Sequence, residues 1–127
     1  MSSFTDYLEN RVLDHIFRAQ ASTAPAAVYL ALFTVTPSDT GGGTEVTGSG
    51  YARKAITFGA SSGGAIFNTS PVSWTAAGGN YGTVVAVAVF DALTTGNMLA
   101  WDGITSAVVN DTDTINFPIG DLDITLT

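Results

Sequence analysis

The sequence offers few side chains that could carry out chemistry. It holds a single histidine, His15, no cysteine, and four basic residues against 11 acidic ones among its 127 residues. Transition-metal sites built from thiolate and histidine ligands are therefore excluded. Asn110, Asp111 and Asp113 could present oxygen atoms to Ca²⁺, but they lack the spacing and the following glutamate of a helical calcium loop. The Asx turns of a β-hairpin account for the same three residues.

The other candidates for catalysis or phosphate binding form no recognisable pattern. Asp91, Asp102, Asp121 and Asp123 fall at or beside predicted turns, where solvated turn residues are the simpler interpretation. Sandwich folds can host a pair of catalytic carboxylates, but nothing in the sequence distinguishes two of them. The glycine run at residues 41–43 lacks the Lys-Ser/Thr that follows a phosphate-binding loop. We therefore expect no catalytic residue, no metal and no cofactor, and we expect that the protein is not an enzyme.

The charge balance argues against two further kinds of partner. The formal net charge is −7, whereas nucleic-acid affinity comes largely from Lys and Arg side chains that neutralise phosphates. Anionic membranes are disfavoured for the same reason, and no apolar run reaches the roughly 18 residues of a membrane span. The N-terminal segment carries Asp6 and Glu9 and does not match a signal peptide. We expect a protein made in the cytoplasm that binds neither nucleic acid nor membranes.

One helix, followed by many strands, must position the polar residues. Apolar residues that step by three and four predict an amphipathic helix over residues 4–20, which Ser3 could cap and Pro25 would follow. This helix packs either on its own sheet or, as an arm, on a neighbouring subunit. The chain thus divides into a helix with its connector (residues 1–26) and a β-sandwich domain (residues 27–127). The apolar stripe consists of Phe4, Leu8, Val12, Leu13, Ile16 and Phe17.

Beyond residue 27 the hydrophobic period changes to two. Residues 28–35 and 83–90 are apolar throughout, which predicts strands covered on both faces. Residues 51–58 predict a strand with alternating faces, and the polar loop at residues 37–50 is long enough to be either mobile or ordered by a partner. Shorter strands with turn signals follow, including separate ones at 98–101 and 104–109. The pattern predicts a mainly β fold, an antiparallel sandwich or jelly roll with one N-terminal helix.

Two pairs of side chains leave alternatives open. Trp74 and Trp101 close short predicted strands, where core packing is the simpler interpretation and a sugar-stacking platform the more specific one. Arg53 and Lys54 form the one basic pair and point to opposite faces of their strand. In so acidic a chain, they are expected to pair with carboxylates either within the subunit or across an interface.

Taken together, several motifs resemble a known family. They are Leu-Glu-Asn-x-x-Leu-Asp-His at residues 8–15, Val-Tyr-Leu-Ala-Leu-Phe-Thr at 28–34, Glu-Val-x-Gly-x-x-Tyr-Ala-Arg at 45–53 and Phe-Pro-x-Gly-Asp-Leu-x-Ile-x-Leu at 117–126. The chain is similar over nearly all its length to small tailed-bacteriophage virion proteins that are often labelled tail fibre proteins. Some relatives are similar to trimeric cement, or decoration, proteins on phage capsids, including those of cyanophages.

The resemblance implies a β-sandwich-like subunit that trimerises on the outer surface of an icosahedral head and bridges major capsid proteins. A charged fraction of only 12% suits a subunit that buries much of its surface against other proteins. The alternatives are a tail or fibre protein, or a receptor-binding module with Trp74 or Trp101 in a sugar site; an enzyme such as a glycan hydrolase is a third class. The residues we expect at capsid or subunit contacts are Phe4, Leu8, Val12, Ile16, Ser38, Asp39, Thr40, Gly41, Thr44, Glu45, Arg53 and Lys54.

Overall fold

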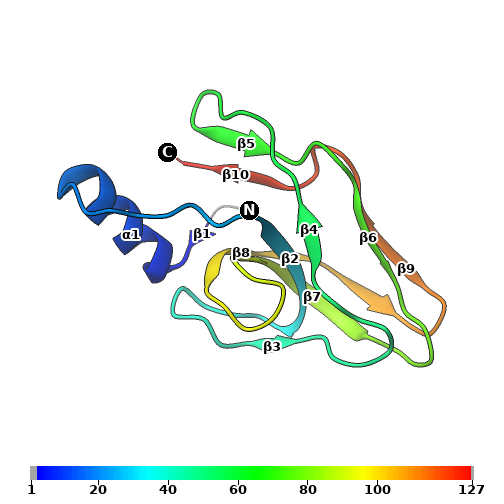
Figure 1. Cartoon of the computed structure of the whole chain (residues 1–127). Helices are drawn as coiled ribbons and strands as arrows, with labels where there is room; N and C mark the ends of the chain where they lie inside the picture. Colours follow the sequence, from blue (N-terminus) through cyan, green and yellow to red (C-terminus); the bar gives the residue numbers. More distant parts are fainter. Residues whose placement is uncertain (1–2, 127) are drawn as a thin grey trace.

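The computed structural model describes residues 3–126 as one helix and ten strands (Figure 1). The elements are β1 (Ser3–Phe4), α1 (Asp6–Phe17), β2 (Val28–Val35), β3 (Thr44–Glu45), β4 (Lys54–Ile56), β5 (Ala65–Phe67), β6 (Val72–Thr75), β7 (Gly82–Phe90), β8 (Met98–Val109), β9 (Thr114–Phe117) and β10 (Asp123–Thr125). This confirms a mainly β fold with one N-terminal helix. No helix in the part of the chain that the structure describes has the length and apolar character needed to cross a membrane.

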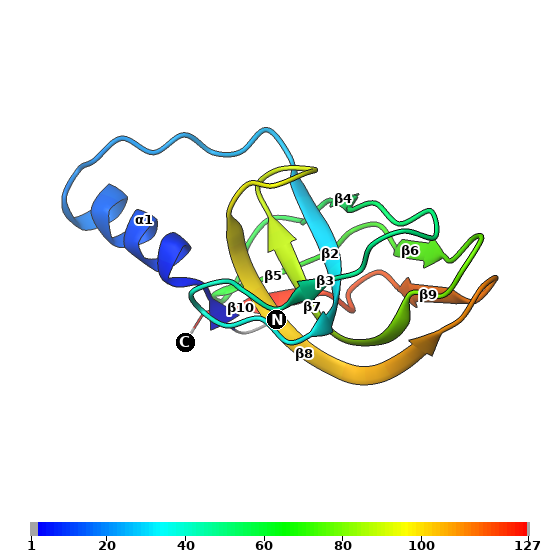
Figure 2. The same ribbon diagram turned by 90° about the horizontal axis from the view of Figure 1, so that it is seen from below.

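The strands form two layers, and every pairing among the described residues is antiparallel. One layer is a six-stranded sheet in the order β1-β8-β7-β2-β3, in which β4 also pairs with β2, beside β3. The other layer consists of two small sheets, β6–β9 and β5–β10. Figures 1 and 2 show the long strands β2, β7 and β8 at the centre of the large sheet and α1 projecting to one side of it. This arrangement is consistent with the predicted β-sandwich.

The main core lies between the two layers. Leu30, Leu32 and Val87 of the large sheet pack in one cluster with Trp74 of β6 and Ile115 of β9. A smaller cluster covers the opposite face of the same central strands. The expectation that β2 and β7 are buried on both faces is therefore confirmed for their central residues. The second cluster contains Ala31, Phe33, Ala86, Ala88, Phe90 and Met98.

The predicted helix boundaries at residues 4 and 20 are wrong. Phe4 belongs to β1, where it pairs with Ala100 of β8. Thr5, and not Ser3, caps the helix: its buried Oγ1 accepts a hydrogen bond from the Leu8 amide and donates one to the Met98 carbonyl at 2.6 Å. The helix ends at Phe17 because Ala19 adopts a positive φ of 55°, well before Pro25. Contacts almost a hundred residues away thus set where the helix begins.

Two strand predictions also need correction. The segments 98–101 and 104–109 were expected as separate strands, but β8 runs unbroken from Met98 to Val109, because Asp102 and Gly103 pair with Val87 and Ala86 of β7. The predicted strand at residues 51–58 is reduced to β4. The segment just before β4 is not a strand, and its Tyr51 and Arg53 side chains form hydrogen bonds with Glu45.

Candidate functional site

The loop between β2 and β4 is ordered by its own chain. The Ser38 and Gly41 amides each donate to the other residue's carbonyl at 2.9 Å, and β3 pairs with the end of β2. Gly43 has a φ of 73°, and a Cβ there would lie 2.6 Å from the Val35 carbonyl oxygen, so this position requires glycine. The expectation of a loop that is either mobile or ordered by a partner therefore needs correction: intrachain hydrogen bonds and strand pairing hold it.

Glu45 and Arg53 form an internal network at this loop. Arg53 donates from Nε to Glu45 Oε2 at 3.0 Å and from Nη2 to Oε1 at 2.9 Å, a bidentate pair. Its Nη1 donates to the carbonyls of Ala92 and Thr95 in the β7–β8 loop. The guanidinium carbon lies 3.6 Å from the centre of the Phe90 ring. Of the two predicted alternatives for Arg53, pairing within the subunit is the one the structure has.

Tyr51 completes the network. Its hydroxyl donates to Glu45 Oε2 at 2.7 Å and accepts from the Leu32 amide at 3.1 Å. Burial, followed by the hydrogen bond to the Glu45 carboxylate, raises the pKa of the Tyr51 phenol well above its ordinary value. The Glu-Val-x-Gly-x-x-Tyr-Ala-Arg motif therefore joins β3, the segment before β4 and the β7–β8 loop.

The raised pKa predicts a loss of stability at alkaline pH. Tyr51 ionises in the unfolded chain above pH ~10 but stays protonated when folded, so its contribution is complete below that pH and falls as the pH rises above it. We expect the free energy of unfolding of the wild type, measured with denaturant from about pH 8 to pH 11, to fall more steeply than that of Tyr51→Phe. Equal slopes for the two proteins would contradict the prediction.

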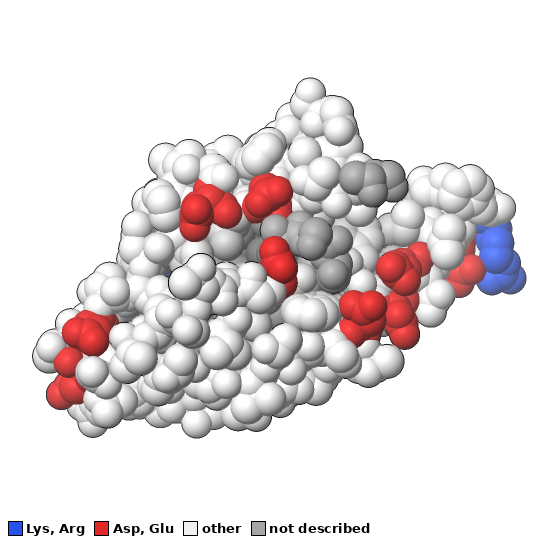
Figure 3. Space-filling view, turned by 180° about the vertical axis from the view of Figure 1, so that it is seen from behind, with Lys and Arg blue, Asp and Glu red and all other residues white. Residues whose placement is uncertain are grey.

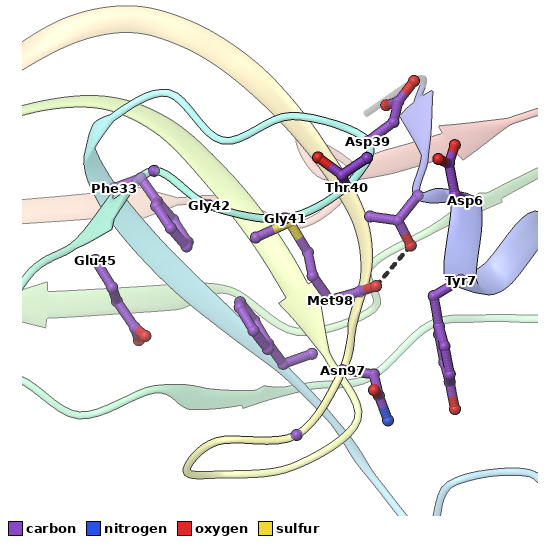
Figure 4. A pocket seen from close by; sticks show the side chains of 14 residues that line it. Asp6, Tyr7, Phe33, Asp39, Thr40, Gly41, Gly42, Glu45, Asn97 and Met98 are labelled. Atoms are coloured by element: carbon purple, nitrogen blue, oxygen red, sulfur yellow. Dashed lines mark hydrogen bonds between the residues drawn. The ribbon is translucent and has the colours of Figure 1, made fainter.

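A pocket of about 600 Å³ lies between this loop, the start of α1 and the β7–β8 loop. Figure 4 shows the Phe33 ring and Met98 toward its centre, with the carboxylates of Asp6 and Asp39 at its margin. Two of its carboxylates already have partners: Glu45 binds Arg53, and Asp39 Oδ1 accepts from Trp101 Nε1 at 3.0 Å. The polar groups here thus fasten the loop to the sheet and to α1.

The predicted contact residues fall into three groups. Ser38 lies in the loop turn, and Asp39, Thr40, Gly41 and Glu45 line the pocket, so the structure brings these loop residues together. The residues of α1 lie on a separate projection, described below, and Phe4 lies at its base in β1. Thr44 and Lys54 are exposed on short strands, whereas Arg53 is engaged with Glu45. That they contact a partner stays a prediction.

The two tryptophans have different roles. Trp74 is only 2% exposed, and its Nε1 donates to the Ala52 carbonyl at 2.7 Å. Core packing is thus confirmed for Trp74, and a sugar platform there is excluded by burial. Trp101 lies within β8, half-buried, and bonds to Asp39 of the loop.

The acidic hairpin turn is held by side-chain hydrogen bonds, but they are not the predicted Asx turns, in which a side chain accepts from an amide two residues further along the chain. Asp113 Oδ2 accepts from the Asn110 amide at 3.0 Å, and Asp111 Oδ1 accepts from the Gly78 amide at 3.0 Å. Within residues 3–126, no group of three or more His, Asp or Glu side chains is arranged to hold a metal ion. At the opposite end of β8, the Asp91 carboxylate accepts hydrogen bonds from Asn97 in its own loop. Burial acts to raise the pKa of Asp91, but these bonds outweigh it and leave the pKa below its ordinary value.

The sequence pattern did not reveal the residue that fixes α1 to the large sheet. Thr5 is buried, its amide donates to the Leu99 carbonyl at 3.0 Å, and the neighbouring Asp6 amide donates to the Asp39 carbonyl at 2.9 Å. A threonine just before an acidic first helical turn is a recognisable cap signal. Placing the cap at Ser3 concealed it.

The chain is thus a compact β domain, and the hydrogen bonds among Glu45, Tyr51 and Arg53 hold its own loops together. A protein-family model matches residues 3–125, nearly the whole chain, and no curated protein matches it in sequence. The match makes the chain a structural protein of a bacteriophage virion. It belongs to the family described as Podophage GP4 fiber I protein gp80. This confirms the resemblance to small phage virion proteins labelled as fibre proteins.

Proposed function

We propose that this chain is a non-catalytic, fibre-type subunit that joins the virion through its N-terminal arm. The observation that carries the proposal is the outer part of the apolar stripe of α1, Leu13, Ile16 and Phe17, whose side chains are mostly exposed. The carboxylate, guanidinium and phenol groups of Glu45, Arg53 and Tyr51 bind one another, which supports a structural role for them. The description of the family as a fibre protein supports the fibre position.

A second candidate is decoration of the head. It is supported by the compact sandwich of 127 residues, which has no internal repeat of the kind that builds a long shaft, and by a net charge of −7, which suits the outside of a shell that packages DNA. In that case the major capsid protein is the partner, and a homotrimer would let one weak contact act three times. The loop residues Asp39 and Thr40 would then be candidates for the shell contact.

Antibody-gold labelling of intact particles distinguishes the two positions. For the fibre assignment we expect label at the tail or at fibres and none spread over the head. Label distributed over the head would overturn the fibre position in favour of decoration. Particles without label, when the antibody recognises the purified protein, would contradict both.

A further inference from the structure

α1 and its connector form an arm, residues 6–26, that projects from the body (Figure 2). Arg11 Nη2 donates to the Thr23 carbonyl at 2.8 Å, and His15 Nδ1 lies 2.9 Å from the Gln20 carbonyl oxygen, so the connector is bound to the helix. None of the 12 residues of α1, all within the described chain, is buried. Figure 3 shows the projection at one end of the molecule, with the basic side chains of that face near its tip. Helix and connector therefore form one unit outside the body.

The arm is fastened to the body at its base. The Thr5 amide and hydroxyl donate to two carbonyls of β8, and Leu8 packs against the main core. Farther out, the side chains of Leu13, Ile16 and Phe17 are 53%, 63% and 78% exposed. A helix rises about 1.5 Å per residue, so α1 is about 18 Å long, and turning it by about 20° at Thr5 moves its tip by about 6 Å. Small changes at the base therefore decide where the exposed apolar tip lies.

A turn of the β2–β4 loop, residues 38–41, holds this base from the side. The first and last residues of the turn exchange two backbone hydrogen bonds, which close it. From this turn, the Asp39 carbonyl accepts a hydrogen bond from the Asp6 amide at 2.9 Å, and Asp39 Oδ1 accepts one from Trp101 Nε1 at 3.0 Å. One residue of the loop thus bonds both to the first residue of α1 and to the large sheet.

The 38–41 turn lies at the edge of the pocket of about 600 Å³ described above. Figure 4 shows Asp39 beside Asp6 at the margin of this pocket, and the Asp39 side chain is exposed. The two ends of the turn are fixed, because Pro37 is buried and Gly43 lies in close contact with the end of β2. Movement of the turn between these two points therefore costs the two hydrogen bonds of Asp39 and leaves the core in place.

We propose that the 38–41 turn is a latch that sets the direction of the arm, with Asp39 as its positioning residue. In the latched state both Asp39 bonds are formed, and the bond to Trp101 holds the Asp39 carbonyl against the Asp6 amide. In the open state both bonds are broken, and the arm swings about Thr5. The latch deepens the proposed function and rests on it for its use, since it gives a set direction to the arm that joins the virion. It is tested on purified protein, so a failed latch would leave the virion position to the labelling experiment.

The direction of the arm can be measured as a distance between two spin labels. The chain has no cysteine, so Leu13→Cys on the arm and Leu93→Cys in the β7–β8 loop, 53% and 50% exposed, provide the only labelling sites. Pulsed electron paramagnetic resonance of this labelled parent should give one narrow distance distribution. Asp39→Ala in the same background removes the acceptor for Trp101, so the distribution should broaden with a second population. Hydrogen exchange of the Asp6 amide should become faster by about tenfold.

Three further variants separate a latch from a general loss of structure. Asp39→Asn keeps an oxygen acceptor and should restore the narrow distribution, whereas Trp101→Phe removes the donor and should broaden it as Asp39→Ala does. Asp111→Ala is the matched control, because this exposed aspartate accepts one hydrogen bond, from the Gly78 amide at 3.0 Å, in another turn. It should match the parent. A broad distribution in the parent, a narrow one in Asp39→Ala, or equal broadening by Asp111→Ala would each overturn the latch.

Discussion

Arg53→Met is expected to lower the free energy of unfolding by about 3–5 kcal/mol, because it removes one partner of a nearly buried ion pair. The Arg53 side chain is 8% exposed and that of Glu45 24%. Without the guanidinium, the Glu45 carboxylate keeps only the Tyr51 hydroxyl as a partner, and the carbonyls of Ala92 and Thr95 lose their donor. Unpaired polar groups away from water account for most of the loss.

Lys54→Met is the matched control for this substitution. It removes the next basic side chain along the sequence, but an exposed one, so a change within about 0.5 kcal/mol is expected. Urea unfolding of both variants, followed by tryptophan fluorescence, makes the measurement. The double variant Glu45→Gln/Arg53→Met should recover part of the loss, since no unpaired charge remains. Equal stability of the Arg53 and Lys54 variants would contradict the role given to the network.

The geometry of the Glu45–Arg53 network explains why the sequence predicts only part of it. Strand alternation predicts different surroundings for Arg53 and Lys54, and the structure has Arg53 nearly buried just before β4 and Lys54 exposed within it. The shortage of cations predicts a carboxylate partner. Choosing Glu45 requires knowing that the loop folds back along β2, where Glu45 pairs with Phe33. That pairing depends on tertiary contacts, which local propensity does not contain.

The helix illustrates the same limit at longer range. Its period of 3.6 predicts α1 and its stripe, including Leu13 and Phe17, from local information alone. Its first turn fails because Phe4 pairs with Ala100, and β-pairing between distant segments overrides a continuing helical pattern. The prediction of separate strands at 98–101 and 104–109 fails for a related reason. The aspartate and glycine that suggest a turn between them are held in a strand by pairing with β7. Strands buried on both faces were predictable because continuous apolar runs leave no polar face to expose.

Trp74→Ala is expected to lower the free energy of unfolding by about 3–5 kcal/mol, through a cavity at the meeting point of the two layers. The centre of the Trp74 ring lies 6.4 Å from the centre of the Tyr51 ring and 6.2 Å from that of the Phe117 ring of β9, which it meets edge to face. Its loss also leaves the Ala52 carbonyl, next to Arg53, without its donor. Small domains are stable by only about 5–15 kcal/mol, so a loss of this size is a large part of the total. Trp74→Phe is therefore the milder companion variant, because it keeps an aromatic ring in the core and removes the indole N–H.

Trp101→Ala is the matched control because it removes the same side chain from a half-buried site whose Nε1 bonds to Asp39. A site that can admit water leaves less of a void, so its expected loss is no more than about half that of Trp74→Ala. Thermal unfolding monitored by circular dichroism gives the comparison. Equal losses at the two positions would mean that Trp101 is as structural as Trp74. A smaller loss at Trp74 would contradict the two-layer core itself, because the Trp74 ring of β6 packs against both the Tyr51 ring and the Phe117 ring of β9.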